Sequence, residues 1–192
     1  MKKILLFSVL ALTSLTGFAQ TKTWTNDPAH SRLGFVVKHL AISEIDGRFA
    51  DFAVNVTTSK ADYSDAQIEL TAKTASVDTD VEARDNHLRT ADFFDVEKFP
   101  TLTFKSTSFQ KVGENKAKLV GNLTLHGVTK AVTLDVVYNG SVVNPMNNQQ
   151  TVGFKITGVL KRSDFGIGAS FPEVVISDDI QIVANAEFSP NK

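Results

Sequence analysis

The sequence contains no cysteine, so no disulfide can hold this chain and its fold depends on a buried apolar core. It also lacks any block of lysine and arginine, and 20 basic residues are nearly balanced by 21 acidic ones. Such a surface argues against nucleic acid as a partner. No internal repeat or low-complexity linker divides the chain. These absences indicate one domain, stabilised by its core alone.

The N-terminal apolar run, Ile4–Leu12, is shorter than the roughly 20 residues that a membrane-spanning helix needs. It follows Lys2 and Lys3, and small residues precede a cleavage position after Ala19. This layout is typical of a secretory signal peptide. We therefore expect export, to the periplasm or out of the cell, with cleavage near Ala19/Gln20. The expected organisation is a signal peptide at 1–19, a linker at 20–23, one domain at 24–189 and a tail at 190–192.

Signatures of catalysis are also missing. The chain has no HExxH motif and no GxSxG elbow, and Gly166-Ile167-Gly168 lacks the third glycine of a dinucleotide fingerprint. Asp27, His30 and Ser31 carry the residue types of a catalytic triad, but adjacency in sequence does not make one. The histidines are widely separated, at His30, His39, His87 and His126. We expect a protein that is not an enzyme, with a metal-dependent barrel enzyme as one alternative.

The dominant pattern that is present is alternation with a period of two, which places successive side chains on opposite faces of a sheet. About eight segments show one apolar face each, separated by turns that contain glycine, asparagine or aspartate. Many such strands in series favour an antiparallel sandwich or a closed barrel. The apolar faces fall within residues 33–37, 52–56, 68–72, 102–104, 119–125, 132–138, 152–160 and 180–188.

One segment departs from this alternation. Thr79 and Glu82 have the spacing of a capping box, and apolar residues then recur at helical intervals, which predicts a helix over about 80–91. The chain continues into the aromatic stretch DFFDVEKFP. We predict an apolar plug where this helix crosses one barrel mouth, formed by Leu88, Phe93, Phe94 and Phe99, with Pro100 fixing the start of the next strand. A small satellite core under the helix is the simpler alternative.

Several short blocks of the sequence form an ordered series. The first is DPAHS at 27–31, with Phe35, His39 and Gly47-Arg48-Phe49 after it; the second is Leu88 with DFFDV at 92–96, Pro100, Phe104 and Ser106. GNLT at 121–124, GVT at 127–129 and RSDFG at 162–166 complete the series, which extends from about Trp24 to Phe188. The order and spacing of the blocks are more specific than any block alone, and together they resemble the YceI-like family.

This resemblance implies an all-β, antiparallel, eight-stranded lipocalin-like barrel, one end of which the predicted short helix would cap. It further implies an exported protein that holds a polyisoprenoid or similar long amphiphile, and it implies no catalytic role and no metal. We expect a binding protein for storage or transfer of such a lipid, for example an isoprenoid quinone, a polyprenyl phosphate or a fatty amide, without a cofactor. Transient membrane contact would accompany exchange of the lipid, and a homodimer is possible.

A barrel of eight strands can be filled by its own side chains or can hold one ligand, and periodicity does not choose between these. A filled barrel that binds another protein is therefore an alternative, and a small outer-membrane barrel is a further class. If the inward faces line a tunnel, the candidate lipid-binding residues are Phe35, Val37, Phe52, Val54, Ile68, Leu70, Phe104, Leu123, Leu134, Val136, Phe154, Ile156, Ile180 and Ile182.

Polar candidates for a lipid head group are fewer. In the segment KRSDFGIGASFP, glycine amides beside Arg162 could receive a phosphate. The alternative is a tight turn with a surface contact between Arg162 and Asp164. The other candidates lie near the expected helix-capped end, at His39, Arg84 and His87.

Overall fold

The computed structural model describes residues 21–60 and 62–191; the predicted signal peptide at 1–19 lies outside them. Strands make up most of this part, with one α-helix and two short 3₁₀ helices. The strands are β1 Lys22–Asn26, β2 Arg32–His39, β3 Ser43–Phe49, β4 Phe52–Thr58, β5 Gln67–Lys73, β6 Val77–Asp78, β7 Thr101–Lys111, β8 Lys116–Leu125, β9 Val128–Val143, β10 Gln150–Lys161 and β11 Ile176–Pro190. The helices are η1 Thr74–Ser76, α1 Glu82–Leu88 and η2 Arg162–Phe165.

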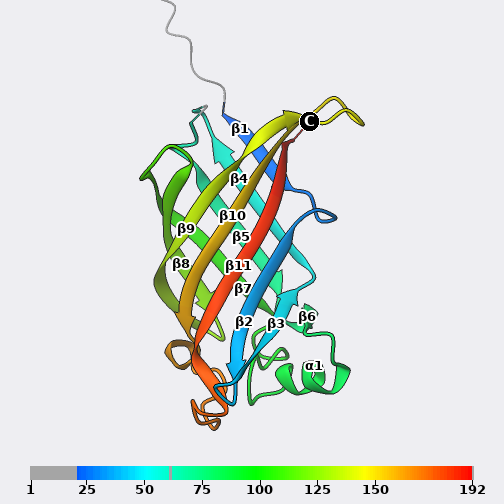
Figure 1. Ribbon diagram of the computed structural model, residues 1–192, viewed down its shortest axis with the longest axis vertical. Helices are drawn as coiled ribbons and strands as arrows, with labels where there is room; N and C mark the ends of the chain where they lie inside the picture. Colours follow the sequence, from blue (N-terminus) through cyan, green and yellow to red (C-terminus); the bar gives the residue numbers. More distant parts are fainter. Residues whose placement is uncertain (1–20, 61, 192) are drawn as a thin grey trace, which may run out of the picture.

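The strands form a closed barrel. Hydrogen-bonded neighbours follow the order β1-β4-β5-β7-β8-β9-β10-β11, and β11 pairs back to β1, with every pairing antiparallel (Figure 1). The predicted eight-stranded antiparallel barrel is therefore confirmed. We call the end where β1 begins and β11 finishes the upper end, and the end with α1 the lower end, as they lie in Figure 1.

Three short strands were not predicted, yet the count of eight still holds because each continues a neighbour around a bend. Asn26 of β1 pairs with Phe188, and Arg32 of β2 pairs with Asn185, so β1 and β2 follow one another along the same edge of β11. In the same way, β3 and β4 form one row, because β3 pairs with β2 and β4 pairs with β1. The next row consists of β5, which pairs with β4, and β6, which pairs with β3. The barrel thus has eight rows, three of them broken.

The bend between β1 and β2 explains the Asp27–Ser31 motif. Asp27 accepts a hydrogen bond from the Ala29 amide and faces Nδ1 of His30 at 2.9 Å. This contact lowers the pKa of Asp27 and raises the pKa of His30. The Ser31 hydroxyl instead bonds the main chain of Glu187, accepting from its amide and donating to its carbonyl. The motif ties the bend to β11, and Ser31 does not complete a triad.

The lower half of the wall is built differently from the upper half. Among the described residues β6 pairs only with β3, so the ladder stops there and does not continue to β7. Residues 79–100, which include α1, and the loop after η2 lie at this end (Figure 1). Side-chain packing, rather than a strand ladder, therefore closes this part of the barrel.

Helix α1 is shorter than predicted, and its predicted cap is wrong. The N-cap residue is Val81, without a side-chain cap bond. The Thr79 amide and hydroxyl both donate to Oδ1 of Asp85, at 2.9 and 2.6 Å. Thr79 therefore lies two residues before the N-cap, and its hydroxyl bonds the Asp85 side chain instead of capping a backbone amide.

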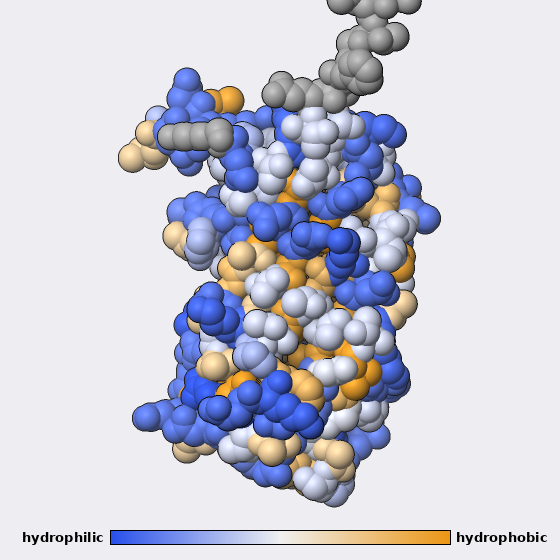
Figure 2. Space-filling model, turned by 180° about the vertical axis from the view of Figure 1, so that it is seen from behind, coloured by the Kyte–Doolittle hydropathy of each residue, from blue (hydrophilic) through white to orange (hydrophobic). Residues whose placement is uncertain are grey.

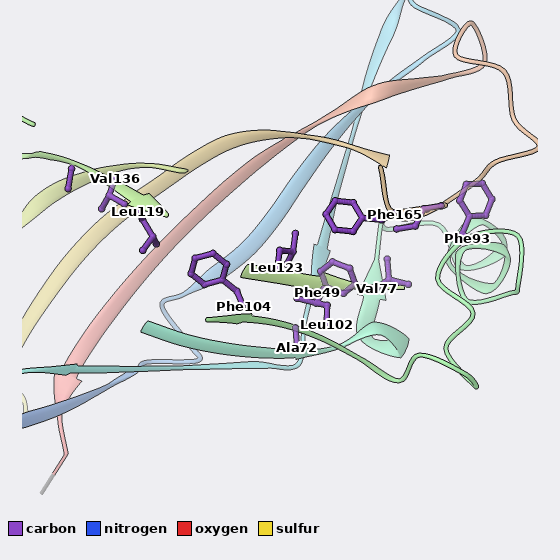
Figure 3. Packing of buried hydrophobic residues seen from close by; sticks show 12 residues of the cluster. Phe49, Ala72, Val77, Phe93, Leu102, Phe104, Leu119, Leu123, Val136 and Phe165 are labelled. Atoms are coloured by element: carbon purple, nitrogen blue, oxygen red, sulfur yellow. The ribbon is translucent and has the colours of Figure 1, made fainter. Parts of the chain in front are cut away.

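The buried core runs along the barrel interior and is densest beside α1. Figure 3 shows Phe49, Val77, Phe93 and Phe165 gathered near the helix, with Leu119 and Val136 farther along the barrel. The outer face carries cross-strand ion pairs instead, such as Lys105–Glu69 and Lys118–Asp135. No helix in the described chain is long and apolar enough to cross a membrane.

Candidate functional site

The barrel interior is hollow. Many inward side chains of the alternating pattern, including Phe35, Phe154 and Ile182, are only partly buried because they border internal space. Two cavities occupy that space among the described residues, one in each half of the barrel, and a third pocket adjoins the upper one beside Tyr63 and Phe154. The prediction left open whether side chains fill the interior, and the cavities answer that question.

The upper cavity has a volume of about 130 Å³. Apart from the exposed Arg32 and the phenol of Tyr63, its lining side chains carry no polar group other than the indole nitrogen of Trp24. The lining comprises Trp24, Arg32, Leu33, Phe52, Val54, Val56, Tyr63, Ala66, Ile68, Leu70, Phe104, Phe109, Leu119, Leu134, Val136, Val152, Phe154, Ile156, Ile182, Ala184, Ala186 and Phe188. This chamber suits a hydrocarbon group.

An aromatic cluster borders the upper cavity. The only tryptophan and both tyrosines of the chain meet here, with ring centroids 6.2 Å apart for Trp24 and Tyr63 and 6.3 Å apart for Tyr63 and Tyr138. Burial raises the pKa of the Tyr63 phenol. The loop that carries Tyr63 is held by Asp65, whose carboxylate accepts hydrogen bonds from the Thr58 and Ser59 hydroxyls.

The lower cavity is larger, about 340 Å³, within the range of small-molecule sites. Its walls are apolar, but its polar members are mainly basic, and no aspartate or glutamate of the described chain lines it. The lining comprises Phe35, Val37, Lys38, His39, Ile45, Phe49, Thr79, Arg84, His87, Leu88, Phe93, Phe94, Leu125, Leu160, Lys161, Arg162, Phe165, Ile167, Phe171, Val175, Ile176, Ile180 and Ile182.

The two cavities adjoin at Ile182, which borders both, and we call this boundary the waist. Two glycines make room for aromatic rings of the lining, one ring in each cavity. A Cβ on Gly47 would lie 2.2 Å from Cζ of Phe35, and one on Gly121 would lie 2.3 Å from Cζ of Phe104. Both rings therefore lie against bare backbone, where the Cβ of any other residue would collide with them. On the outer surface, seen from behind the view of Figure 1, apolar patches lie between polar side chains (Figure 2).

The aromatic stretch after α1 forms the wall of the lower cavity. Phe93 is buried and stacks on Phe171, with centroids 4.9 Å apart, and Phe94 contacts Phe49 at 5.4 Å. Leu88 lines the same cavity. Phe99 lies apart from them, against His126 at 4.6 Å, and does not border the cavity. Three of the four predicted plug residues are thus brought together, and Phe99 secures the turn between β8 and β9.

Arg162 holds the loop that faces residues 79–100, which we call the lid of the lower cavity. Its side chain is 8% exposed, and all five guanidinium N–H groups can be accounted for by backbone acceptors. The Nη1 atom donates to the carbonyls of Ile167 and Gly168, and Nη2 donates to those of Phe171 and Ile176. The Nε atom faces the carbonyl of Ser177 at 3.3 Å. No donor is left for a head group.

Two expectations for this loop are corrected. Arg162 does not contact Asp164, because η2 turns the arginine inward and leaves Asp164 outside, where it pairs with Lys130 at 2.6 Å. The glycine amides are also engaged: Gly166 donates to the Ser163 carbonyl and Gly168 donates to the Asp92 carbonyl. These two glycine amides are therefore not free to receive a phosphate.

The placement of the predicted residues is otherwise simple. Every candidate lining residue borders one of the cavities except Leu123, which is buried in the core cluster. All four head-group candidates, His39, Arg84, His87 and Arg162, line the lower cavity. The roles of His39, Arg84 and His87 in binding stay predictions, whereas the donors of Arg162 are taken by backbone carbonyls.

Sequence reasoning missed several lining residues. Trp24 lies on a strand of only five residues, too short for alternation to reveal, and Tyr63 lies in a loop. Phe165 and Phe171 belong to the loop after β10, outside any strand pattern. For Phe165, the RSDFG block was a signal that its ring could be buried.

One group of potential metal ligands occurs in the described part of the chain. Asp27, His30 and Glu187 lie within reach of one ion, but they are on the outer surface at the bend between β1 and β2. None of them lines either cavity. His39 and His87 both border the lower cavity, but neither belongs to the metal-ligand group found among the described residues.

Fold and cavities together define a class: an antiparallel eight-stranded barrel, lipocalin-like in build, with a hollow apolar interior and a helical cover at one end. The chain belongs to the YceI-like family, since residues 24–188 match the YceI-like domain. A UPF0312 protein of Staphylococcus aureus strain N315 is 39% identical over 170 residues, which cover 86% of this chain and 96% of that relative.

Solved structures agree with this assignment. The YceI protein of Campylobacter jejuni has a TM-score of 0.74 and 33% identity, with 81% of this chain and 90% of that chain covered. A polyisoprenoid-binding domain from Saccharophagus degradans has a TM-score of 0.61, covering 88% of this chain and 98% of that one. At 20% identity, the second similarity shows a shared fold.

Proposed function

We propose that this protein is a carrier or store that holds one long-chain amphiphile, a polyisoprenoid or a related lipid, inside the barrel. The observation that carries the proposal is the pair of adjoining cavities, whose apolar lining extends from Trp24 at the upper end to Phe93 at the lower end. The Saccharophagus domain of similar fold is a polyisoprenoid-binding domain, which is in keeping with this proposal. Ligands in this class include isoprenoid quinones, polyprenyl phosphates and fatty amides.

Energetics favour exchange with a membrane over capture from water. Burying one CH₂ group gains about 0.8 kcal/mol, so a five-carbon isoprene unit gains about 3–4 kcal/mol when it leaves water. A few isoprene units would reach the practical limit of non-covalent affinity, about −18 to −21 kcal/mol. A tail that leaves a bilayer is already out of water, so its net gain is small. Selection then rests on the length of the cavity and on the head group.

A surface beside the lower cavity suits contact with the donor membrane. The turn between β2 and β3 exposes Leu40 and Ile42, the latter by 86%, and the Leu40 amide donates to the carbonyl of Val175 in the neighbouring loop. Leu40 and Ala41 both have positive φ angles, a conformation that glycine or asparagine adopts at lower cost. We call the part of the lower cavity next to this turn the lower mouth. Backbone strain and exposed apolar side chains there support a role in membrane contact rather than in folding.

The compartment and partners follow the sequence predictions. We place the protein in the periplasm or outside the cell, because residues 1–19 have the pattern of a signal peptide. Its partners in this proposal are the lipid and, transiently, a membrane; no nucleic acid and no cofactor is involved.

The first test is mass spectrometry of the protein purified from its own compartment without detergent, in the native state and after solvent extraction. We expect a stoichiometric adduct that extracts as a polyprenyl lipid, a quinone or a fatty amide. A clean apo mass, with no uptake of a labelled polyprenyl lipid from liposomes, would overturn the proposal.

A matched pair of variants locates the lipid. Ala184 faces the upper cavity and its neighbour Asn185 is exposed on the outer face of the same strand. We expect Ala184→Phe to reduce uptake of a long tail from liposomes, because the ring occupies the cavity, while Asn185→Phe leaves uptake unchanged. Equal uptake by both variants would show that the tail does not enter the upper cavity.

Membrane contact has its own pair. Ile42→Asp should slow transfer of lipid between liposomes, since a carboxylate at the mouth resists insertion among lipids. Met146, 90% exposed in the hairpin between β9 and β10, provides the control at the upper end. If Met146→Asp slows transfer and Ile42→Asp does not, the protein approaches membranes with its other end.

A further inference from the structure

The ionisable side chains around the ligand space are distributed unevenly. Six basic or imidazole side chains border the lower cavity, and no carboxylate of the described chain does. The upper cavity borders one exposed arginine and no carboxylate. The whole sequence carries a net charge of −1, so this basic lining is a local feature of an otherwise balanced protein.

Three of these six side chains already have hydrogen-bond or ion-pair partners within the protein. Lys161 pairs with Asp179 at 2.7 Å and with Asp178 at 3.6 Å. Nε2 of His87 lies 3.1 Å from Oδ2 of Asp92. Arg162 donates to backbone carbonyls, as described above. These contacts hold the mouth together, and they leave the guanidinium charge of Arg162 buried beside the cavity without a carboxylate partner in the described chain.

The other three have capacity to bind. Lys38, His39 and Arg84 form no ion pair within residues 21–60 and 62–191. Arg84 uses Nε and Nη2 to hold Thr79, through its hydroxyl at 2.7 Å and its carbonyl at 2.8 Å. Its Nη1 group has no such contact. The guanidinium is thus held in place, partly buried, with donors to spare beside the cavity.

We propose that the lower mouth is a binding site for an anionic head group, a phosphate or a carboxylate, held by Arg84 and His39 with Lys38 at the rim. This deepens, and rests on, the proposed lipid-carrying function. An arginine with a fixed orientation suits oxyanions, and the buried charge of Arg162 adds to the positive potential of the site. A neutral head group would gain little from either feature.

The same arrangement fixes the direction of the ligand. With its head at the lower mouth, the tail must pass the waist and point toward Trp24. Ile180 borders the lower cavity and Phe188 borders the upper one, eight residues later on β11. At about 3.3 Å per residue, less the tilt of the strand, this corresponds to about 19–22 Å. Only a tail of about that length reaches Trp24.

The charge preference is tested with two lipids of equal tail length, a polyprenyl phosphate and the corresponding polyprenol, offered in phosphatidylcholine liposomes. Loading is measured by native mass spectrometry. We expect the wild type to favour the phosphate by about tenfold, less at high salt, and Arg84→Gln and Lys38→Gln to reduce that ratio. Arg48→Gln and Lys118→Gln, which remove exposed charges from the outer surface, should retain it.

The outcomes separate the two proposals. Equal loading of both lipids by the wild type would overturn the anionic site and leave the carrier function standing; loading of neither lipid would overturn the carrier function itself. If Arg84→Gln loosens the lid and loads nothing, Arg84→Lys decides, because it keeps the charge and should keep the preference. Full preference in Lys38→Gln together with none in Arg84→Lys would contradict a site based on charge.

Direction is tested with the single native tryptophan. A phosphate lipid with a nitroxide at the tail end should quench the fluorescence of Trp24 strongly, and one with the nitroxide near the head should not. The opposite result would place the head group at the upper end and overturn the proposal.

Discussion

The two halves of the barrel enclose the same interior by different means. In the upper half, β11 pairs with β1 and β1 pairs with β4, so a continuous ladder of main-chain hydrogen bonds closes the wall. In the lower half the ladder stops at β6, and the wall is made of side chains from residues 79–100 and from the loop after η2. A ladder opens only when strands separate, whereas packed side chains can move apart locally. The half without a complete ladder is also the half whose cavity has the basic lining.

The largest effect should come from removing the anchor of the lower half. Arg162→Leu leaves several carbonyls without a donor, at about 1–3 kcal/mol each for those that stay buried, so we expect a total loss of about 3–5 kcal/mol. Urea unfolding measures it. Lys155→Leu, on the exposed face of β10, should change stability by no more than about 0.5 kcal/mol. A small loss in Arg162→Leu would show that the loop does not depend on this side chain.

Removing a buried ring from each half should separate local from global opening. Phe93→Ala and Phe188→Ala each delete a buried aromatic ring, with an expected cost of about 3–5 kcal/mol. Hydrogen exchange should rise in residues 79–100 for the first variant and throughout the β1–β11 seam for the second. Phe94→Ala should cost less, about 1–2 kcal/mol, because the ring is only partly buried. Identical exchange patterns would mean that the two halves open together.

Trp24 should be unexpectedly tolerant. Its side chain is 4% exposed, but Nε1 is buried with no hydrogen-bond partner in the described chain. Trp24→Phe removes that unsatisfied donor along with part of the ring, so the gain offsets part of the lost packing. We expect a net change within about 1 kcal/mol, measured by thermal unfolding followed by circular dichroism. A loss of about 3 kcal/mol in the free energy of unfolding would show that packing of the full indole dominates.

The smallest effect concerns the loop over the upper cavity. Hydrogen bonds from the Ser59 and Thr58 hydroxyls hold the pKa of Asp65 well below its usual range. Because the folded-state pKa is lowered, this stabilisation is present above the unfolded value near 3.8 and is lost as the pH falls further. Trp24 emission should therefore shift to the red in the wild type only as the pH falls well below the usual aspartate value of about 4. Asp65→Asn should show a smaller shift; an unchanged shift would assign it to another group.

The sequence allowed the regular part of this protein to be predicted, and the reason is physical. Alternation identifies the inward face of any strand long enough to show it, so residues such as Phe35, Leu134 and Ile182 were placed correctly. The same rule fails for Trp24, whose strand is short, and for Tyr63 and Phe171, which loops carry inward.

Polar details were harder because they depend on long-range partners. Arg162 looked available in sequence, but five carbonyls between Ile167 and Ser177 occupy it in the fold. Thr79 had the spacing of a cap, yet Asp85 takes its hydroxyl. A local pattern cannot reveal which acceptor the fold brings near a donor. The cavities were equally unpredictable, since they depend on how rings such as Phe104 lie against Gly121.

The seam between β1 and β11 has a practical consequence. Trp24 pairs with Pro190, and the Asn191 amide donates to the Thr23 carbonyl, so the beginning and end of the domain are neighbours at the upper end. A short peptide could join them, and new ends could be cut into the exposed hairpin around Met146 without touching the mouth. A circularly permuted barrel, or one attached to a surface through that seam, would keep its basic opening facing outward. The fold thus offers a ready handle for a lipid sensor or an immobilised trap.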